Sequence, residues 1–153
     1  MVAVFLQGEG EKAFCAGGDI RAMYQSAQQN PAGPAVEAEY FFEREYRLNY
    51  CLHTYPKPLI CLGHGVLMGG GMGLYEPCDY RLVTPSTRIA MPEIAIALYP
   101  DVAASYFMPK WPRGSGYFLA LTGASINARD ALDLGLAHYA IADDMQKTLI
   151  EAL

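Results

Sequence analysis

Two glycine-rich turns constrain what this chain can fold into. Gly17 and Gly18 precede Asp19, and the glycine run 69–71 follows the apolar segment 59–62. Glycine permits the tight turn by which a buried strand passes into a helix, and the first backbone N–H groups of a helix have no partner within it. These donors and the helix dipole favour negative charge. The two turns therefore predict two places where a developing anion can be held.

Carboxylates follow the second turn in the sequence. Glu93 stands in Met91-Pro92-Glu93, and Asp101 follows Pro100. Backbone donors combined with acids are typical of enzymes that act on a carbonyl whose transition state carries negative charge. Both acids also have structural interpretations, because Glu93 can cap the turn after it and Asp101 can be the N-cap of a helix that begins at 102.

Strands that alternate with helices predict an α/β fold, and no internal sequence repeat is visible. The long helix carries an apolar stripe formed by Phe41, Leu48, Leu52 and Tyr55. Asn127 is the expected N-cap of a later helix. The predicted strands are 2–6, 59–62, 80–83, 88–90 and 138–141, and the predicted helices are 19–27, 36–55, a short one in the glycine run, 102–108, 114–121, 128–134 and one from 143 to 153.

The composition limits the classes of partner. With 153 residues, of which 52% are hydrophobic, the chain is expected to form one domain, 1–153, with a substantial core. A net charge of −5 provides no basic face for nucleic acid. A ligand that carries phosphate would need local cations, for which the sequence offers Lys12, Arg21, Lys57 and Arg113.

Other site types are not supported by the sequence. No apolar segment approaches about twenty residues, so no membrane span and no signal peptide is expected. The four cysteines form no C-x-x-C pair and are expected to be reduced core residues in a cytosol-like compartment. The three histidines are dispersed, so no metal site is expected and His64 is interpreted as structural. The glycine run lacks the Lys-Ser/Thr of a phosphate-binding loop, and no G-x-S-x-G elbow is present.

The order of motifs carries a resemblance to a known family. A-G-G-D-I at 16–20, K-P-x-I with G-x-x-x-G-G-G at 57–71, C-D-x-R at 78–81 and M-P-E at 91–93 together resemble the crotonase (enoyl-CoA hydratase/isomerase) superfamily. The segments 41–49, 99–102 and 106–109 resemble its 3-hydroxyisobutyryl-CoA hydrolase branch. The resemblance implies a crotonase-like (ClpP/crotonase) fold of repeated β-β-α units. It also implies that 1–153 is a partial acyl-CoA-binding core without the N-terminal elements and the C-terminal helical region of the family.

The resemblance implies roles for particular residues. The thioester oxygen would be held by the backbone N–H groups of Gly18 and Gly70, and the M-P-E acid, Glu93, would act as nucleophile or as general base. Asp101 matches an acid of the hydrolase branch that assists proton transfer, and Glu45 matches a position near the substrate's hydroxyl end. From the residues alone, Glu45 can equally form a solvated ion pair with a neighbouring arginine. Further substrate-binding positions are Ala16, Gly17, Asp19, Gly69 and Gly71.

Departures from the family pattern bear on the reaction. Family hydratases carry a second glutamate where this chain has Gly73, and Glu76 is interpreted as a helix-end charge. Hydration of an enoyl thioester is therefore disfavoured. Ala103 and Ala104 replace glycines usual in the branch, which is expected to add two methyl groups near the acyl pocket.

The resulting expectation is hydrolysis of a short 3-hydroxyacyl-CoA thioester, as in valine catabolism. The alternatives are an enoyl-CoA isomerase or hydratase, and a non-catalytic fragment that assembles with partners. No cofactor is expected, because coenzyme A is part of the substrate. A homo-oligomer in the cytoplasm, or in the mitochondrial matrix of a eukaryote, is expected, with no nucleic acid and no membrane as partner. Glu93 is expected to be shielded by Tyr99 and apolar neighbours, which would raise its pKa.

Overall fold

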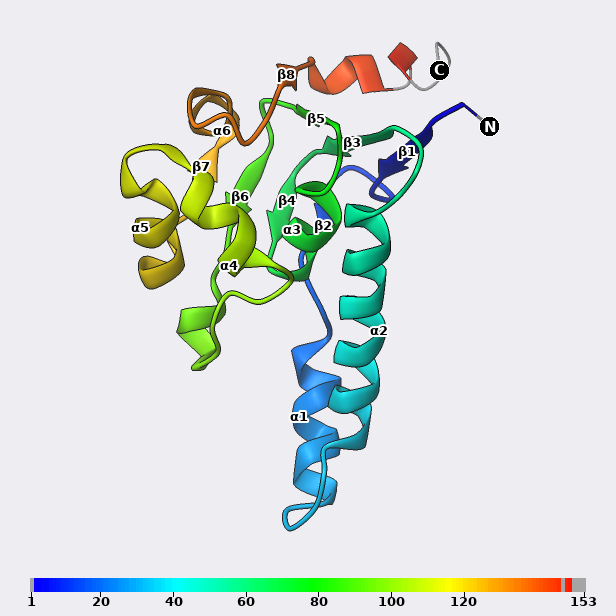
Figure 1. Ribbon diagram of the computed structural model, residues 1–153, viewed down its shortest axis with the longest axis vertical. Helices are drawn as coiled ribbons and strands as arrows, with labels where there is room; N and C mark the ends of the chain where they lie inside the picture. Colours follow the sequence, from blue (N-terminus) through cyan, green and yellow to red (C-terminus); the bar gives the residue numbers. More distant parts are fainter. Residues whose placement is uncertain (1, 147, 150–153) are drawn as a thin grey trace.

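The computed structural model describes residues 2–146 and 148–149, and it places the strands in two sheets (Figure 1). The first sheet has the order β1-β3-β5-β8 and is parallel throughout. Its strands are β1 (Val4–Gln7), β3 (Leu59–Gly63), β5 (Tyr80–Val83) and β8 (Tyr139–Ala140). The second sheet has the order β2-β4-β6-β7, in which only the β6–β7 pair is antiparallel. Its strands are β2 (Ala13–Cys15), β4 (Val66–Met68), β6 (Arg88–Ala90) and β7 (Ile126–Asn127).

The two sheets arise from a repeated β-β-α unit. In three successive units, β1-β2, β3-β4 and β5-β6, the first strand joins the first sheet, the second strand joins the other, and helical structure follows; β7 and β8 fall outside this repeat. The helices are α1 (Ile20–Gln29), α2 (Val36–His53), α3 (Gly70–Tyr75), α4 (Ala104–Phe107), α5 (Ser115–Thr122) and α6 (Ala128–Asp133). Four 3-10 turns complete the order: η1 (Glu93–Ile96), η2 (Met108–Lys110), η3 (Pro112–Gly114) and η4 (Asp143–Met145). The predicted α/β class is confirmed.

The predicted elements agree with the structure where a local signal defines them. The strands at 80–83 and 88–90 have the predicted bounds. Asp19 accepts hydrogen bonds from the backbone N–H groups of Arg21 and Ala22 at 3.0 and 3.1 Å and so caps α1. Asn127 and Asp130 form a reciprocal capping box at α6. Beyond η4, residues 146, 148 and 149 are helical, and the rest of the helix predicted to reach 153 lies outside the described residues.

Other predictions were wrong in extent. The helix predicted over 102–108 is reduced to α4 and η2, because Val102 and Ala103 have φ angles of +42° and +69° that break a right-handed helix. The strand expected to be buried on both faces, β1, is an edge strand with half-buried residues. The strands β2, β4 and β7 were not predicted, since segments of two or three residues carry too short a pattern to recognise.

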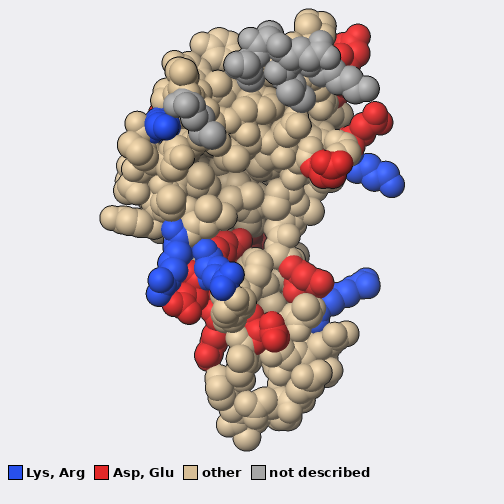
Figure 2. Space-filling model, turned by 90° about the vertical axis from the view of Figure 1, so that its right-hand side faces the viewer, with Lys and Arg blue, Asp and Glu red and all other residues tan. Residues whose placement is uncertain are grey.

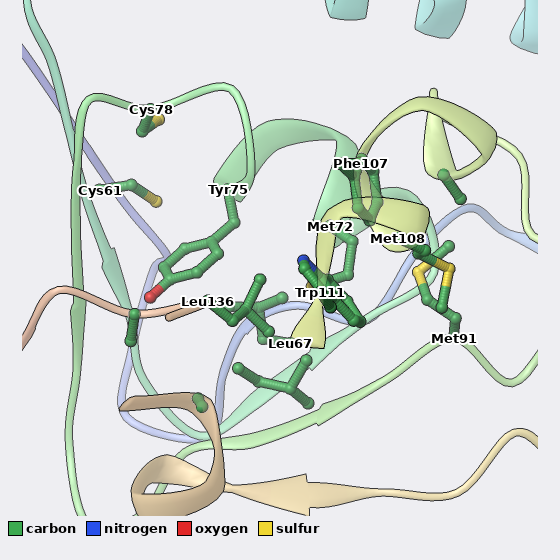
Figure 3. Close-up of a cluster of buried hydrophobic side chains, with 14 of the residues drawn as sticks. Cys61, Leu67, Met72, Tyr75, Cys78, Met91, Phe107, Met108, Trp111 and Leu136 are labelled. Carbon is green, nitrogen blue, oxygen red and sulfur yellow. The ribbon is translucent and has the colours of Figure 1, made fainter. Parts of the chain in front are cut away.

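The core lies around α3, between the sheets and the helices α4 and α5. Tyr75 is fully buried in it, and its hydroxyl donates to the backbone oxygen of Leu82 at 3.3 Å. Figure 3 shows Cys61 and Cys78 beside this ring, so two of the four cysteines are core residues as predicted. The prediction was wrong for Cys51, which is exposed.

The helices α1 and α2 form a hairpin that projects from the body (Figure 1). None of residues 20–29 is buried, and the only buried residue of α2 is Asn49. The predicted apolar stripe is confirmed only in part: Leu52 packs against the core and Phe41 is half-buried, whereas Leu48 is 47% exposed and Tyr55 lies beyond the helix end. A polar residue takes the inner position, because the amide of Asn49 donates to the backbone oxygen of Gly73 in α3 at 3.1 Å.

Charged side chains gather where the hairpin meets the body. Figure 2 shows acidic and basic groups interspersed around this narrow region, so the face in view carries no uniform basic patch among the described residues. Among those residues, no helix combines the length and the apolar character that crossing a membrane requires.

Candidate active site

A cavity of about 260 Å³ opens where the hairpin, the two glycine turns and η1 meet. The first turn contributes Ala16, Gly17 and Gly18, and the second contributes Gly69 and Gly70. The remaining wall is largely apolar, with Phe41 and Phe42 among its residues. Three carboxylates from different parts of the chain also line it: Glu45 of α2, Glu93 of η1 and Asp101. The structure thus brings together eight of the ten predicted site residues.

The two glycine turns are in contact at the cavity wall. A Cβ built on Gly17 would lie 3.4 Å from the backbone nitrogen of Gly70. Gly70 is the first residue of α3, whereas Gly18 lies in the loop before the N-cap of α1, so only one of these amides belongs to a helix. Among the described residues, neither amide nitrogen donates a hydrogen bond to an acceptor. Both residues line the cavity, and within the described part of the chain their amides have no acceptor.

Glu45 and Glu93 approach the backbone of the second turn. The carboxylate of Glu45 lies against the Cα of Gly70, where any side chain would collide with it. A Cβ on Gly69 would lie 3.1 Å from Oε1 of Glu93, and the φ of +55° with ψ of −125° at Gly69 is a conformation that glycine alone adopts readily. The backbone conformation thus requires glycine at Gly69, and a side chain at Gly70 would displace the carboxylate of Glu45.

The other two predicted positions serve the scaffold. Asp19 caps α1 and does not line the cavity. Gly71 is buried, and its Cα packs against the backbone oxygen of Cys15. His64 is likewise a buried scaffold residue, whose Nε2 lies 2.9 Å from the backbone oxygen of Gly10.

Glu93 is a buried acid. Only 6% of its surface is exposed, and among the described residues its Oε2 has no hydrogen-bond partner. Burial raises its pKa, the charge of Asp101 acts in the same direction, and the backbone amide of Glu93 partly opposes both. No side-chain capping bond is made at η1. Burial in the cavity wall, and not a cap of η1, is therefore the main feature of the Glu93 carboxylate.

The shield around Glu93 differs from the prediction. Tyr99 is 69% exposed and lines a neighbouring cavity, not the one that contains Glu93. Pro92, Leu98 and the glycine turns form the wall near Glu93 instead. The expected contribution of Tyr99 was wrong, because of the neighbours Leu98 and Tyr99 only Leu98 lines this cavity.

Glu45 is free of the ion pairs that its neighbours suggested. Arg47 pairs with Glu43 at 2.6 Å, and the Arg44 guanidinium lies 4.3 Å from the centre of the Tyr40 ring. Burial raises the pKa of Glu45 to about 7, with smaller contributions from the charges of Asp101 and Glu93. A carboxyl that is partly protonated near neutral pH can both donate and accept hydrogen bonds.

Asp101 is held by a side chain that sequence reasoning missed. The hydroxyl of Tyr46 donates to Asp101 Oδ2 at 2.7 Å, whereas α4 begins at Ala104 without a side-chain cap. The capping interpretation of the Asp101 side chain is therefore wrong, since the hydrogen bond from Ala104 N, at 2.6 Å, goes to the backbone oxygen of Asp101 and not to its carboxylate. In the described part of the chain, the His, Cys, Asp and Glu residues form no group that could hold a metal ion.

Asn49 is the second residue that sequence reasoning missed. A Cβ on Gly73 would lie 2.6 Å from Asn49 Nδ2 and 2.6 Å from Val102 Cβ. The space in which a hydratase would place its second glutamate is thus filled by neighbouring side chains. Glu76 is the C-cap residue of α3 and does not line the cavity, as predicted.

The methyl groups of Ala103 and Ala104 do not reach this cavity, contrary to expectation. Ala103 lines the neighbouring cavity and Ala104 is buried in the core. The four predicted phosphate-binding cations, Lys12, Arg21, Lys57 and Arg113, line none of the described cavities.

A sequence model of the enoyl-CoA hydratase/isomerase family matches residues 1–153. The chain belongs to this family. Its relatives in the family include the mitochondrial 3-hydroxyisobutyryl-CoA hydrolase of Danio rerio, which is 43% identical over 146 residues, 95% of this chain and 37% of the relative. Its fold matches a carnitinyl-CoA dehydratase from Mycobacterium thermoresistibile with a TM-score of 0.91 and 39% identity, over 99% of this chain and 43% of that one. The predicted crotonase fold is confirmed, and the chain spans less than half the length of these relatives.

Another relative in this family bears a different kind of name. The small ribosomal subunit protein mS47 of Neurospora crassa is 40% identical over 137 residues, 89% of this chain and 27% of the relative. Membership of the family therefore does not by itself decide between catalysis and another role, and the side chains of the cavity must carry that argument.

Proposed function

We propose that the whole protein hydrolyses the thioester of a short 3-hydroxyacyl-CoA, with 3-hydroxyisobutyryl-CoA of valine breakdown as the substrate. The observation that carries this proposal is the set of acids on the cavity wall. Glu93, Glu45 and Asp101 line one cavity with the two glycine turns, while Asn49 and Val102 fill the space at Gly73. The site thus has acids for a carbonyl reaction and for a hydroxyl group, but no room for the second glutamate of a hydratase.

In this mechanism the thioester oxygen accepts hydrogen bonds from the backbone N–H groups of Gly18 and Gly70. Donors placed where negative charge develops are each worth about 2.7–4 kcal/mol of transition-state stabilisation. Glu93 acts as nucleophile on the carbonyl carbon or as general base on a water molecule. The carbon–sulfur bond breaks and the coenzyme A thiolate takes up a proton. With Glu93 as general base, the attacking water supplies the new oxygen of the carboxylic acid; with Glu93 as nucleophile, water then hydrolyses the anhydride between Glu93 and the acyl group, which releases the acid and restores the Glu93 carboxylate.

The hydroxyl of the substrate is assigned to Asp101 and Glu45. Both line the cavity that contains Glu93, and the raised pKa of Glu45 permits it to donate a hydrogen bond near neutral pH. A site built to bond a hydroxyl discriminates strongly against the analogue that lacks it, because its buried polar groups are then left without partners. The reaction requires no cofactor, since coenzyme A is part of the substrate.

Location and assembly follow from the same proposal. The relatives named as hydrolases are called mitochondrial, so in a eukaryote we expect the mitochondrial matrix, and in a bacterium the cytoplasm. We also expect the protein to form a homo-oligomer. The proposed reaction needs neither nucleic acid nor a membrane as a partner.

Steady-state kinetics of the whole protein test the proposal. We expect a preference for 3-hydroxyisobutyryl-CoA over isobutyryl-CoA of far more than tenfold in kcat/KM, and little turnover of crotonyl-CoA or 3-hexenoyl-CoA. Asp101→Asn or Glu45→Gln should reduce the preference. Efficient turnover of 3-hexenoyl-CoA would favour an isomerase with Glu93 as its one base. A protein inert toward all four thioesters would favour a binding role, which the likeness to a ribosomal subunit protein makes the second candidate.

A further inference from the structure

Asp101 lies in the wall between two cavities. A second cavity, of about 690 Å³, is bounded by α2, by the loop around Tyr99 and by α4. Within the part of the chain that the structure describes, Asp101 is the one residue that lines both cavities. Tyr46 lines only the second cavity and bonds to Asp101 from that side. The hydrogen bond between them therefore forms part of the partition, with the proposed reaction on one side.

Asp101 lies in a segment without regular secondary structure, between η1 and α4. Three residues of this segment, Ala97, Val102 and Ala103, have φ angles of +58°, +42° and +69°. Among the described residues, Tyr46 is the only side chain that donates a hydrogen bond to the Asp101 carboxylate. This contact joins residues that are 55 positions apart in the sequence.

Tyr46 is itself held in place by the helix that carries it. Its ring stacks on Phe42, one turn earlier in α2, with ring centres 5.6 Å apart and an angle of 28° between the planes. Partial burial and the hydrogen bond to Asp101 raise the pKa of the Tyr46 phenol, so it stays a donor over the working pH range. A rigid helix thus presents one fixed donor to a carboxylate on an irregular loop.

We propose that Tyr46 is a positioning residue for the hydrolysis, which holds the Asp101 carboxylate at the face of the cavity where the substrate hydroxyl binds. This inference rests on the proposed function, because it assigns to Tyr46 the orientation of a group that the proposal places at the substrate. Tyr46 does not line the first cavity, so its action is indirect. Loss of its hydroxyl should consequently affect hydroxylated substrates more than others.

Tyr46→Phe in the whole protein tests the proposal, because it removes one oxygen and retains the ring that stacks on Phe42. Without this donor the Asp101 carboxylate loses its side-chain hydrogen bond, so kcat/KM for 3-hydroxyisobutyryl-CoA should fall about tenfold or more. The kcat/KM for isobutyryl-CoA, which lacks the hydroxyl, should change less than about twofold. The matched control is Tyr50→Phe, since Tyr50 lines the second cavity from the next turn of α2 and makes no side-chain hydrogen bond among the described residues. It should leave both values unchanged.

Asp101→Asn, alone and combined with Tyr46→Phe, shows whether Tyr46 acts through Asp101. Groups that act as a unit are not additive, so Tyr46→Phe should have no further effect on the substrate preference once Asp101 is changed. A preference that survives Tyr46→Phe but falls with Asp101→Asn refutes the role of Tyr46 and leaves the proposed function intact. An equal loss of kcat/KM for both thioesters also refutes the role, because it would indicate a structural defect that does not depend on the substrate hydroxyl. A preference insensitive to Asp101→Asn removes the proposed task of Asp101 and that of Tyr46 with it.

Discussion

Replacing Gly73 with alanine tests whether the site has room for a second acid on α3. The new Cβ would lie 2.6 Å from Asn49 Nδ2 and from Val102 Cβ, closer than real Cβ contacts allow. Neither neighbour can move easily, because Asn49 is 3% exposed and bonded to Gly73 O, and Val102 is 1% exposed. The change therefore either displaces the packed side chains or breaks the hydrogen bond of Asn49.

The expected magnitude follows from these two contacts. Overpacking a core costs about 1–3 kcal/mol, and leaving the buried amide of Asn49 without its partner costs about 1–3 kcal/mol more. Alanine is favoured over glycine within a helix by about 1 kcal/mol. The free energy of unfolding should therefore fall by about 3 kcal/mol, although helix propensity alone predicts a gain.

Urea unfolding of the whole protein, followed by circular dichroism, measures this change. Two control variants are Asn49→Ala alone and Asn49→Ala combined with Gly73→Ala. Truncating Asn49 eliminates one of the two collisions. The loss of unfolding free energy in the double variant should therefore be smaller, by about 1 kcal/mol or more, than the sum of the losses in the two single variants. An unfolding free energy of Gly73→Ala equal to or above that of the wild type would refute the reasoning, because α3 would then have space for a side chain.

Three further predictions concern the acids and the loop beside them. Glu93→Gln should lower the turnover of 3-hydroxyisobutyryl-CoA at least about a hundredfold while the circular dichroism spectrum is unchanged; near-normal turnover would exclude Glu93 as nucleophile or base. The pKa of Glu45 is raised from 4.5 to about 7 on folding, so its contribution to stability is complete below pH 4.5 and is lost as the pH rises through 7. Glu45→Gln should therefore gain stability relative to the wild type between pH 5 and pH 8 in thermal unfolding, and a constant difference would contradict the raised pKa. Ala103→Gly should raise the free energy of unfolding by up to about 1 kcal/mol in urea, because Ala103 has a φ of +69°, and a clear loss would contradict strain at this position.

Much of the scaffold follows from signals that lie close together in the sequence. Asp19 caps α1 through amides two and three residues away, and Asn127 forms its capping box with Asp130. The two glycine turns, the acid at Glu93 and the α/β order are likewise visible as short motifs. These features depend on bonds within a few residues, which the sequence alone determines.

The tertiary structure decided which side chains form the site and which protonation state is favoured there. Glu45 stands next to arginines in the sequence, yet the helix turns them elsewhere, and burial raises its pKa to about 7. Asp101 has the sequence context of a helix cap, but the positive φ angles after it shorten the helix, and its carboxylate bonds to Tyr46, 55 residues away. Asn49, a polar residue that the predicted apolar stripe did not include, is the buried residue of α2 because α3 presents a backbone oxygen to its amide. Partners this far apart in the chain meet only when helices and loops pack, so no local pattern specifies them.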